Sequence, residues 1–111
     1  MNSNKKLVII SNEKTSISKD GIYCDNIDMK SIPEGLSKNY EVSMIVRKSN
    51  IKRSHQINLE KIKLANNIFK FLFNILKTLK YKEVNYLLVS ITPYTFFAYL
   101  LLFIFRKKIF I

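Results

Sequence analysis

Short apolar runs alternate with polar segments along this chain, and the first half predicts strand, helix and strand. The run KKLVIIS at Lys5–Ser11 is rich in β-branched residues and predicts a buried strand. A helical pattern follows, capped by Asp25 or Asn26 and ending at Asn39 in a left-handed conformation. Glu41–Arg47 (EVSMIVR) predicts the next strand. This order of elements is typical of a parallel strand pair with a helical crossover.

Three segments of the first half give weaker predictions. The polar stretch from Ser11 to Ile22 is rich in Ser, Asn and Lys and predicts a long loop. Pro33 and Gly35 are expected to interrupt or kink the helix that contains them. His55–Lys63 alternates moderately between apolar and polar residues, which predicts a polar edge strand.

The second half contains the clearest helical periodicity of the chain. Apolar residues recur at the spacing of an amphipathic helix at Leu64, Ile68, Phe71, Leu72, Ile75, Leu76 and Leu79. Phe69 and Phe73 widen this stripe, and the polar side is formed by Lys70, Asn74, Lys77 and Thr78. The stripe fits packing against a sheet. It also fits a basic helix that lies on anionic lipid.

The uncharged segment from Val84 to Phe105 has two interpretations. Taken whole, it approaches the length of a membrane span. Pro93 favours two elements instead, a buried strand at Asn85–Ile91 and a helix that begins near Pro93 with Thr92 as its N-cap. The uninterrupted helix would then be about 18 Å long, short of the ~30 Å hydrocarbon core of a bilayer.

The single-span interpretation stays open at this stage, because proline also occurs inside membrane helices. It would place a helix at Tyr86–Phe105, followed by cytoplasmic Arg106 to Lys108. The last residues, Lys108 to Ile111, predict the start of a further buried strand. A domain rarely ends on such an apolar run, so we expect this chain to be a fragment.

The chain carries a formal net charge of +11, and Glu83 is its one acidic residue after Glu60. This excess of positive charge favours an anionic partner. A phosphate-bearing ligand, an acidic membrane surface and nucleic acid are the three alternatives. A lysine-rich composition that serves solubility is the simpler alternative. Nucleic acid is the least expected partner, since no aromatic platform or recognition motif accompanies the lysines.

Candidate chemistry is sparse in this sequence. Cys24 is the single cysteine and His55 the single histidine, which leaves no disulfide within the chain and no metal-binding spacing. Cys24 fits a small apolar thiol near a helix start better than a nucleophile. No carboxylate pair, catalytic triad or P-loop occurs, so no catalytic residue is assigned. The polar start has no secretory signal, which predicts a cytoplasmic protein, with the inner face of the membrane as a further expected location.

The order of these segments resembles a known family. The chain is similar to the N-terminal Rossmann-like domain of two-domain (GT-B type) glycosyltransferases. The resemblance rests on the order of KKLVIIS, IDMKSIPEGLSKNYEVSMIVRKS, the lysine-rich helix and VNYLLVSITPYTFFAYLLLFIFRKKIFI. Gly35–Val42 corresponds to the family's "ALAERGHEV"-like junction, and Asn85–Pro93 resembles its "DVVHVHSP" strand and turn. The resemblance covers nearly the whole chain but no catalytic motif. The family's first-loop glycine pair is missing, with Gly21 nearby.

The resemblance implies an α/β fold with a partial Rossmann-like parallel sheet of order 3-2-1-4-5 and helices on both faces. Residues 1–111 would form an incomplete acceptor-side domain. Ligands in such sheets bind at the carboxyl ends of the strands, which would place Ser11-Asn12 and Ser90 to Tyr94 on either side of one crevice. Asn12, Thr92 and Tyr94 are the acceptor-binding candidates. Alternatively, Thr92 only caps a helix and Tyr94 only packs.

The function implied by the resemblance is sugar transfer from a nucleotide-sugar to a polysaccharide or lipid-linked acceptor. The nucleotide-sugar site would lie in a C-terminal domain that this chain lacks, so no cofactor is expected on it, and the fragment would be inactive alone. Peripheral contact with an anionic membrane is a further expected interaction. The alternative function is that of a small basic membrane protein, either single-pass or interfacial.

Overall fold

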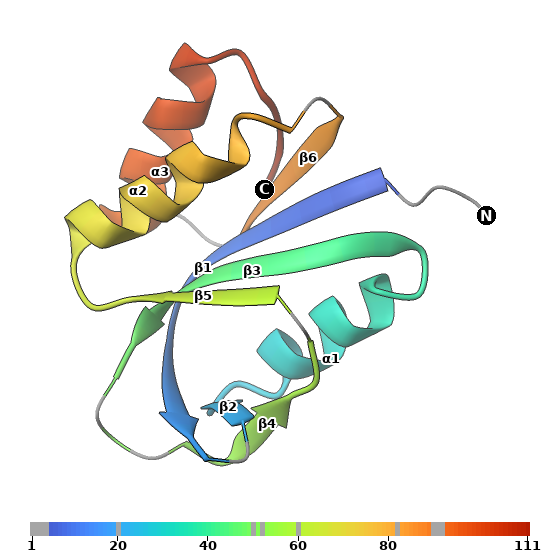
Figure 1. Cartoon of the computed structure of the whole chain (residues 1–111), viewed down its shortest axis with the longest axis vertical. Helices are drawn as coiled ribbons and strands as arrows, with labels where there is room; N and C mark the ends of the chain where they lie inside the picture. The colour runs from blue at the N-terminus through green and yellow to red at the C-terminus, as the bar shows by residue number, and fades with distance from the viewer. Residues whose placement is uncertain are drawn as a thin grey trace.

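The computed structural model describes residues 5–19, 21–49, 51, 53–59, 61–81, 83–89 and 93–111. These residues form an α/β structure with one open, mixed sheet and three helices (Figure 1). The helices are α1 (Asp28–Leu36), α2 (Ile68–Thr78) and α3 (Pro93–Ile104). The strands are β1 (Lys5–Ser18), β2 (Gly21–Cys24), β3 (Tyr40–Lys48), β4 (His55–Ile57), β5 (Lys61–Ala65), β6 (Val84–Val89) and β7 (Lys108–Phe110). The predicted α/β class is confirmed.

The first half of β1 is the centre of a parallel region. It pairs with β3 on one side and with β6 on the other, so that Ile9 lies opposite both Met44 and Leu87. β5 adds to the outer edge of β3, and β7 adds to the outer edge of β6. All of these pairs are parallel. The central strands of this region, the first half of β1, β3 and β6, are mostly apolar and buried, as expected for a sheet that is covered on both faces, while the edge strands β5 and β7 are more exposed.

The second half of β1 leaves this region and forms an antiparallel lobe with β2 and β4, at the bottom of Figure 1. The prediction of a loop from Ser11 to Ile22 is therefore wrong. A tight hairpin pairs Ser18 with Gly21, whose φ is +153°. A side chain at Gly21 would meet the Nε2 atom of Gln56 at 2.4 Å. The predicted order 3-2-1-4-5 numbered only the strands that were expected in a parallel sheet. The strands labelled β2 and β4 in the structure were not among them, so the strand order of the mixed sheet differs from the prediction.

Helices cover both faces of the sheet, and each face has its own apolar cluster. α1 packs on one face, where the buried residues include Leu7, Ile9, Met29, Val42, Met44, Val46 and Ile57. α2 and α3 lie side by side on the other face, over Val8, Ile10, Ile45, Tyr86 and Leu88 (Figure 1). The alternation of β1 residues between the two clusters follows from the period of two in a strand.

The first helix differs in detail from its prediction. It begins at Asp28, after an Asx turn in which the Oδ1 atom of Asn26 accepts from the backbone N–H of Asp28 at 2.9 Å. Pro33 lies inside the helix, which continues to Leu36, so the expected interruption does not occur. Asn39 does not have the left-handed conformation predicted for it. Among the described non-glycine residues, positive φ occurs at Arg106 and not at Asn39.

The predicted edge strand at His55–Lys63 is two strands with different partners. β4 pairs antiparallel with β2, and β5 pairs parallel with β3. The predicted helix at Leu64–Leu79 begins later, at Ile68, because Leu64 and Ala65 still belong to β5. The side chain of Asn67 caps this helix by accepting from the N–H of Lys70 at 2.8 Å.

Strand and helix are separate elements in the apolar C-terminal third. β6 ends at Val89 and α3 begins at Pro93, so the alternative of one continuous helix from Tyr86 to Phe105 is wrong. Thr92, the predicted cap, lies outside the described residues. In the part of the chain that the structure describes, no helix reaches the length and apolarity that a membrane crossing requires. The strand expected at Lys108 to Ile111 is present as β7, but it is not buried as predicted: it pairs only with β6 among the described strands, and Phe110 is 48% exposed.

Candidate functional site

A polar crevice opens where the parallel part of β1 ends. Its volume is about 530 Å³, and its lining includes Ser11, Asn12, Glu13, Asp25, Arg53 and Val89. β1 pairs with β3 on one side of this point and with β6 on the other, and the helices that follow, α1 and α3, cover opposite faces. Such a switch in direction at the carboxyl ends of parallel strands is where ligands bind in open α/β sheets. We call it the carboxyl-end crevice.

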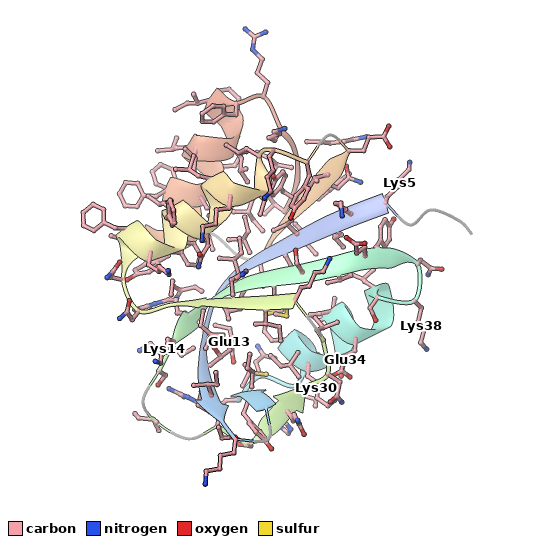
Figure 2. The ribbon with its side chains drawn as sticks, in the orientation of Figure 1. Lys5, Glu13, Lys14, Lys30, Glu34 and Lys38 are labelled. Atoms are coloured by element: carbon pink, nitrogen blue, oxygen red, sulfur yellow. The ribbon has the colours of Figure 1, made fainter. Side chains whose placement is uncertain are left out.

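Glu13 shapes the side of the crevice next to α1. Its carboxylate accepts from the backbone N–H groups of Asp25, at 3.3 Å, and Asn26, at 3.0 Å. Figure 2 shows Glu13 and Lys14 where β1 bends toward the lobe. Backbone N–H groups in front of a helix normally attract a phosphate or another anion. Here the protein's own carboxylate takes that position, so the crevice is not a phosphate cradle.

Arg53 ties the loop after β3 to the crevice. Its Nη1 atom donates to the Oδ2 atom of Asp25 at 2.6 Å, and its Nη2 atom donates to Ser49 at 2.8 Å. The hydrogen bond and charge of Arg53 hold the pKa of Asp25 below its usual value of 3.8. A carboxylate held so firmly in its ionised form is a poor proton acceptor near neutral pH. We therefore do not assign the role of a catalytic base to Asp25.

The structure brings two of the three predicted acceptor residues near each other. Asn12 lines the crevice, and its Oδ1 atom accepts from the Nη1 atom of Arg47 at 3.2 Å. The guanidinium of Arg47 also lies over the ring of Tyr94, 4.1 Å from its centroid. Tyr94 packs edge-on against Phe71 and is not part of the crevice lining. The crevice therefore contains Asn12, while Tyr94 supports the arginine that holds it.

The sequence did not predict that Glu13, Asp25 and Arg53 line the crevice. Asp25 was predicted only as a possible helix cap. Glu13 falls in a segment predicted to be a loop, and Arg53 lies between the strands predicted at Glu41–Arg47 and His55–Lys63. Neither segment has a motif that predicts these contacts.

Ser11 was predicted at the end of the first strand, but β1 continues to Ser18, and Ser11 lies where the pairing of β1 with β6 ends. Its hydroxyl is buried, donates to the sulfur of Met29 at 3.1 Å and accepts from the N–H of Glu13 at 3.0 Å.

Cys24 does not supply a nucleophile to this crevice. It is fully buried, and its thiol donates to the carbonyl of Asn26 at 3.3 Å. Burial first, and then the negative charges of Glu13 and Asp25, raise the pKa of the thiol from 9.0 to about 11. The thiol is therefore protonated at neutral pH. Among the described residues, no group of three His, Cys, Asp or Glu side chains is arranged to hold a metal ion.

A second notable surface is the outer side of α2 and α3. Figure 2 shows aromatic rings on these helices pointing away from the sheet. We call this surface the α2–α3 aromatic face, and its exposed members are Phe69, Phe73, Leu76, Phe96, Phe97, Leu100, Phe103, Ile104 and Phe105. Phe69 is 82% exposed and Phe103 is 64% exposed. Exposed cations flank the face at Lys70, Lys77 and Arg106.

Fold and site together define an α/β protein with an open mixed sheet and a polar crevice at the carboxyl ends of its central strands. Comparison with protein-family models, with curated proteins and with solved structures found no match.

Proposed function

We propose that this chain is the acceptor-side α/β part of a glycosyltransferase. In this proposal the carboxyl-end crevice binds the sugar of a polysaccharide or lipid-linked acceptor. A nucleotide-sugar donor would be held by a second domain. The observation that carries the proposal is the polar crevice at the switch point of the parallel strands.

The chemistry of the crevice favours an acceptor sugar over a nucleotide. Hydroxyl, amide, carboxylate and guanidinium groups line it, and these groups exchange hydrogen bonds with sugar hydroxyls. Glu13 already accepts the backbone N–H groups that a phosphate would need. A sugar with no charge avoids the repulsion between Glu13 and a phosphate group.

Sugar binding is tested by NMR on the isotopically labelled chain. Methyl glycosides of common hexoses and a set of disaccharides are added, and the backbone amide signals are followed. We expect saturable shifts at Asn12, Asn26 and Val89, which surround the crevice. N12A is expected to weaken this binding, and N39A serves as the matched control because Asn39 is exposed at the turn before β3. Equal weak shifts over the whole surface, or equal binding by both variants, would contradict the proposal.

The α2–α3 aromatic face favours a second candidate function, binding to the interface of an anionic membrane. Exposed apolar patches that are flanked by cations are typical of surfaces that enter the lipid headgroup region. Each cation close to an anionic leaflet contributes roughly 1 kcal/mol to such binding. This candidate is compatible with a lipid-linked acceptor, since the face and the crevice use different residues.

Membrane binding is tested by flotation with vesicles that contain or lack phosphatidylglycerol. We expect binding to the anionic vesicles only, weakened by added salt and reduced at least about tenfold by the double variant F69S/F103S. I17S is the matched control, because Ile17 is 59% exposed and belongs to the antiparallel lobe. Equal flotation of F69S/F103S and I17S would exclude the aromatic face as the lipid contact. Sedimentation of the wild-type chain as a dimer, lost in F69S/F103S, would make the face a protein interface instead.

A further inference from the structure

A cleft of about 390 Å³ lies at the opposite end of the parallel strands from the crevice. Its lining includes residues near the starts of three strands, Lys6 on β1, Glu41 on β3 and Lys61 on β5, together with residues from the last turn of α2. We call it the amino-end cleft. It shares no lining residue with the carboxyl-end crevice, so the two are tested separately.

The amino-end cleft has a large excess of positive charge. Five lysines line it, namely Lys6, Lys61, Lys63, Lys77 and Lys80, against a single carboxylate, Glu41. Glu41 forms ion pairs with both Lys6 and Lys61, and the hydrogen bond from Lys6 is the main reason that the pKa of Glu41 lies below 4.5. The three other lysines form no ion pair with a described residue. A cleft lined by one sign of charge attracts and concentrates the opposite ion.

Asn74 provides an observation that does not depend on charge. It is 4% exposed and lines the cleft from α2, although its sequence pattern predicted the polar, outward side of the helix. Its Nδ2 atom is buried and has no hydrogen-bond partner among the described residues. An unmet buried donor costs free energy, and native proteins rarely keep one without a use. An acceptor atom of a ligand in the cleft would satisfy it.

We propose that the amino-end cleft binds a phosphate monoester, with the amide of Asn74 and the ammonium groups of Lys63, Lys77 and Lys80 around its phosphate. A phosphate monoester carries nearly two negative charges and offers three strong acceptor oxygens, which suits several cations and one neutral donor. The cleft is large enough for a small organic molecule as well as the phosphate. Val8 and Ile45 in the lining provide apolar contacts for the organic part.

The phosphate could belong to a soluble metabolite or to a lipid headgroup, and one pair of probes separates these sources. Glycerol 3-phosphate is the soluble probe, and vesicles that contain phosphatidic acid present a lipid phosphate monoester. The labelled chain is titrated with glycerol 3-phosphate, and with potassium chloride at matched ionic strength, while the side-chain amide signal of Asn74 is followed. We expect a saturable shift of this signal with the phosphate ester and none with chloride.

Two variants test whether the cleft itself is responsible. N74D keeps the shape of the side chain but replaces the donor by a carboxylate, and we expect it to weaken glycerol 3-phosphate binding at least about tenfold. K63Q/K77Q changes two exposed side chains, which leaves folding intact, and is expected to weaken binding severalfold. K38Q is the control, because Lys38 is an exposed lysine outside the cleft, just beyond the end of α1 (Figure 2).

The possible results separate cleanly. Binding of the soluble ester that N74D and K63Q/K77Q weaken supports the proposal with a soluble ligand. Loss of binding to phosphatidic acid vesicles in N74D, whose residue is not part of the α2–α3 aromatic face, with no binding of glycerol 3-phosphate, supports it with a lipid phosphate. Binding that all variants share with K38Q, or an Asn74 shift equal to that in chloride, overturns it. Folding of each variant is checked by its thermal transition, and K63Q/K77Q decides the matter if N74D does not fold.

Discussion

The parallel region and the antiparallel lobe share β1, yet different forces hold them. In the parallel region Ile9, Ile10, Met44 and Tyr86 have no exposed area. The lobe buries fewer apolar side chains, Cys24 and Ile57 among them, and Ile17, an apolar residue on its part of β1, is 59% exposed. Apolar burial thus dominates at one end of β1, while hydrogen bonds and ion pairs contribute a larger share at the other.

Contacts at the bend of β1 show how the two regions are joined. The buried hydroxyl of Thr15 donates to the carbonyl of Arg47 at 2.8 Å, and the N–H of Ser49 donates to the carbonyl of Thr15 at 2.7 Å. The register of β1 against β3 shifts between Ile10 and Lys14, just before these contacts. An irregularity of this kind bends a strand. Beyond it β1 keeps its pairing with β3 as far as Thr15, and from Thr15 it also pairs with β2.

The largest expected effect comes from removing apolar burial in the parallel region. Phe71 is fully buried on α2 and contacts Tyr94 at a centroid distance of 5.2 Å. F71A is expected to lower the free energy of unfolding by about 3–5 kcal/mol. I17A in the lobe is expected to change it by less than about 0.5 kcal/mol. Urea unfolding followed by circular dichroism measures both.

F71L extends this comparison if F71A is too unstable to fold. It keeps most of the apolar volume and is expected to cost about 1 kcal/mol. A cost for I17A that equals the cost for F71L would mean that the lobe also depends on apolar packing, and the contrast between the two regions would be lost.

The same contrast explains which parts of the fold could be predicted from the sequence. β3, β6 and α3 were found because apolar runs and Pro93 mark them, and such runs follow from burial against the sheet and its covering helices. An apolar run also marked β7, although that strand is largely exposed. The lobe was missed because the residues from Ser11 to Ile22 are mostly polar, and their pairing depends on hydrogen bonds to β2. Nothing in a polar stretch tells a solvated loop from a short paired strand.

The candidate sites divide in the same way. Asn12 was placed at the end of the first strand by the general position of ligand sites in α/β sheets, and it does line the crevice. Glu13 contacts Asp25, which lies 12 residues further along the chain, and Arg53 contacts Asp25 across 28 residues. No local sequence pattern predicts contacts over such separations. Asn74 was assigned to the outer side of its helix because it is polar, although Phe71 and Ile75, which share its side, face the sheet.

A smaller effect is expected from the polar contacts that join α1 to the lobe. Glu34 accepts from Lys30, at 2.8 Å, and from the backbone N–H of Asn58 after β4, at 2.7 Å. Figure 2 shows Lys30 and Glu34 next to each other on α1. Burial acts to raise the pKa of Glu34, but the bonds from Lys30 and Asn58 and the charge of Lys30 outweigh it, so the pKa lies below 4.5.

Because the pKa of Glu34 is lower in the folded chain than in the unfolded chain, its ionised form stabilises the fold above about pH 4.5. This stabilisation is lost as the pH falls through the lower, folded-state pKa. E34Q is expected to cost about 1 kcal/mol near pH 7, after allowance for partial exposure, and less at low pH. Urea unfolding at both pH values measures the difference. E83Q, at an exposed carboxylate before β6, is the control, and an E34Q cost that does not change with pH would contradict the role of the charge.

The smallest effect is expected at the end of α3, where backbone geometry can be separated from packing. Arg106 has a φ of 57°, and the N–H groups of Arg106 and Lys107 donate to the carbonyls of Phe103 and Leu102, each at 3.0 Å. In helix endings of this kind, the residue with the left-handed conformation is usually glycine, and here it is Arg106. R106G removes the steric strain but also removes a cation from the negative end of the helix dipole. We expect a net gain of about 0.5 kcal/mol in urea unfolding, because packing, not this turn, stabilises the parallel region. A loss of more than about 1 kcal/mol would show that the arginine side chain itself holds α3 in place, and local polar contacts would then matter in the parallel region as they do in the lobe.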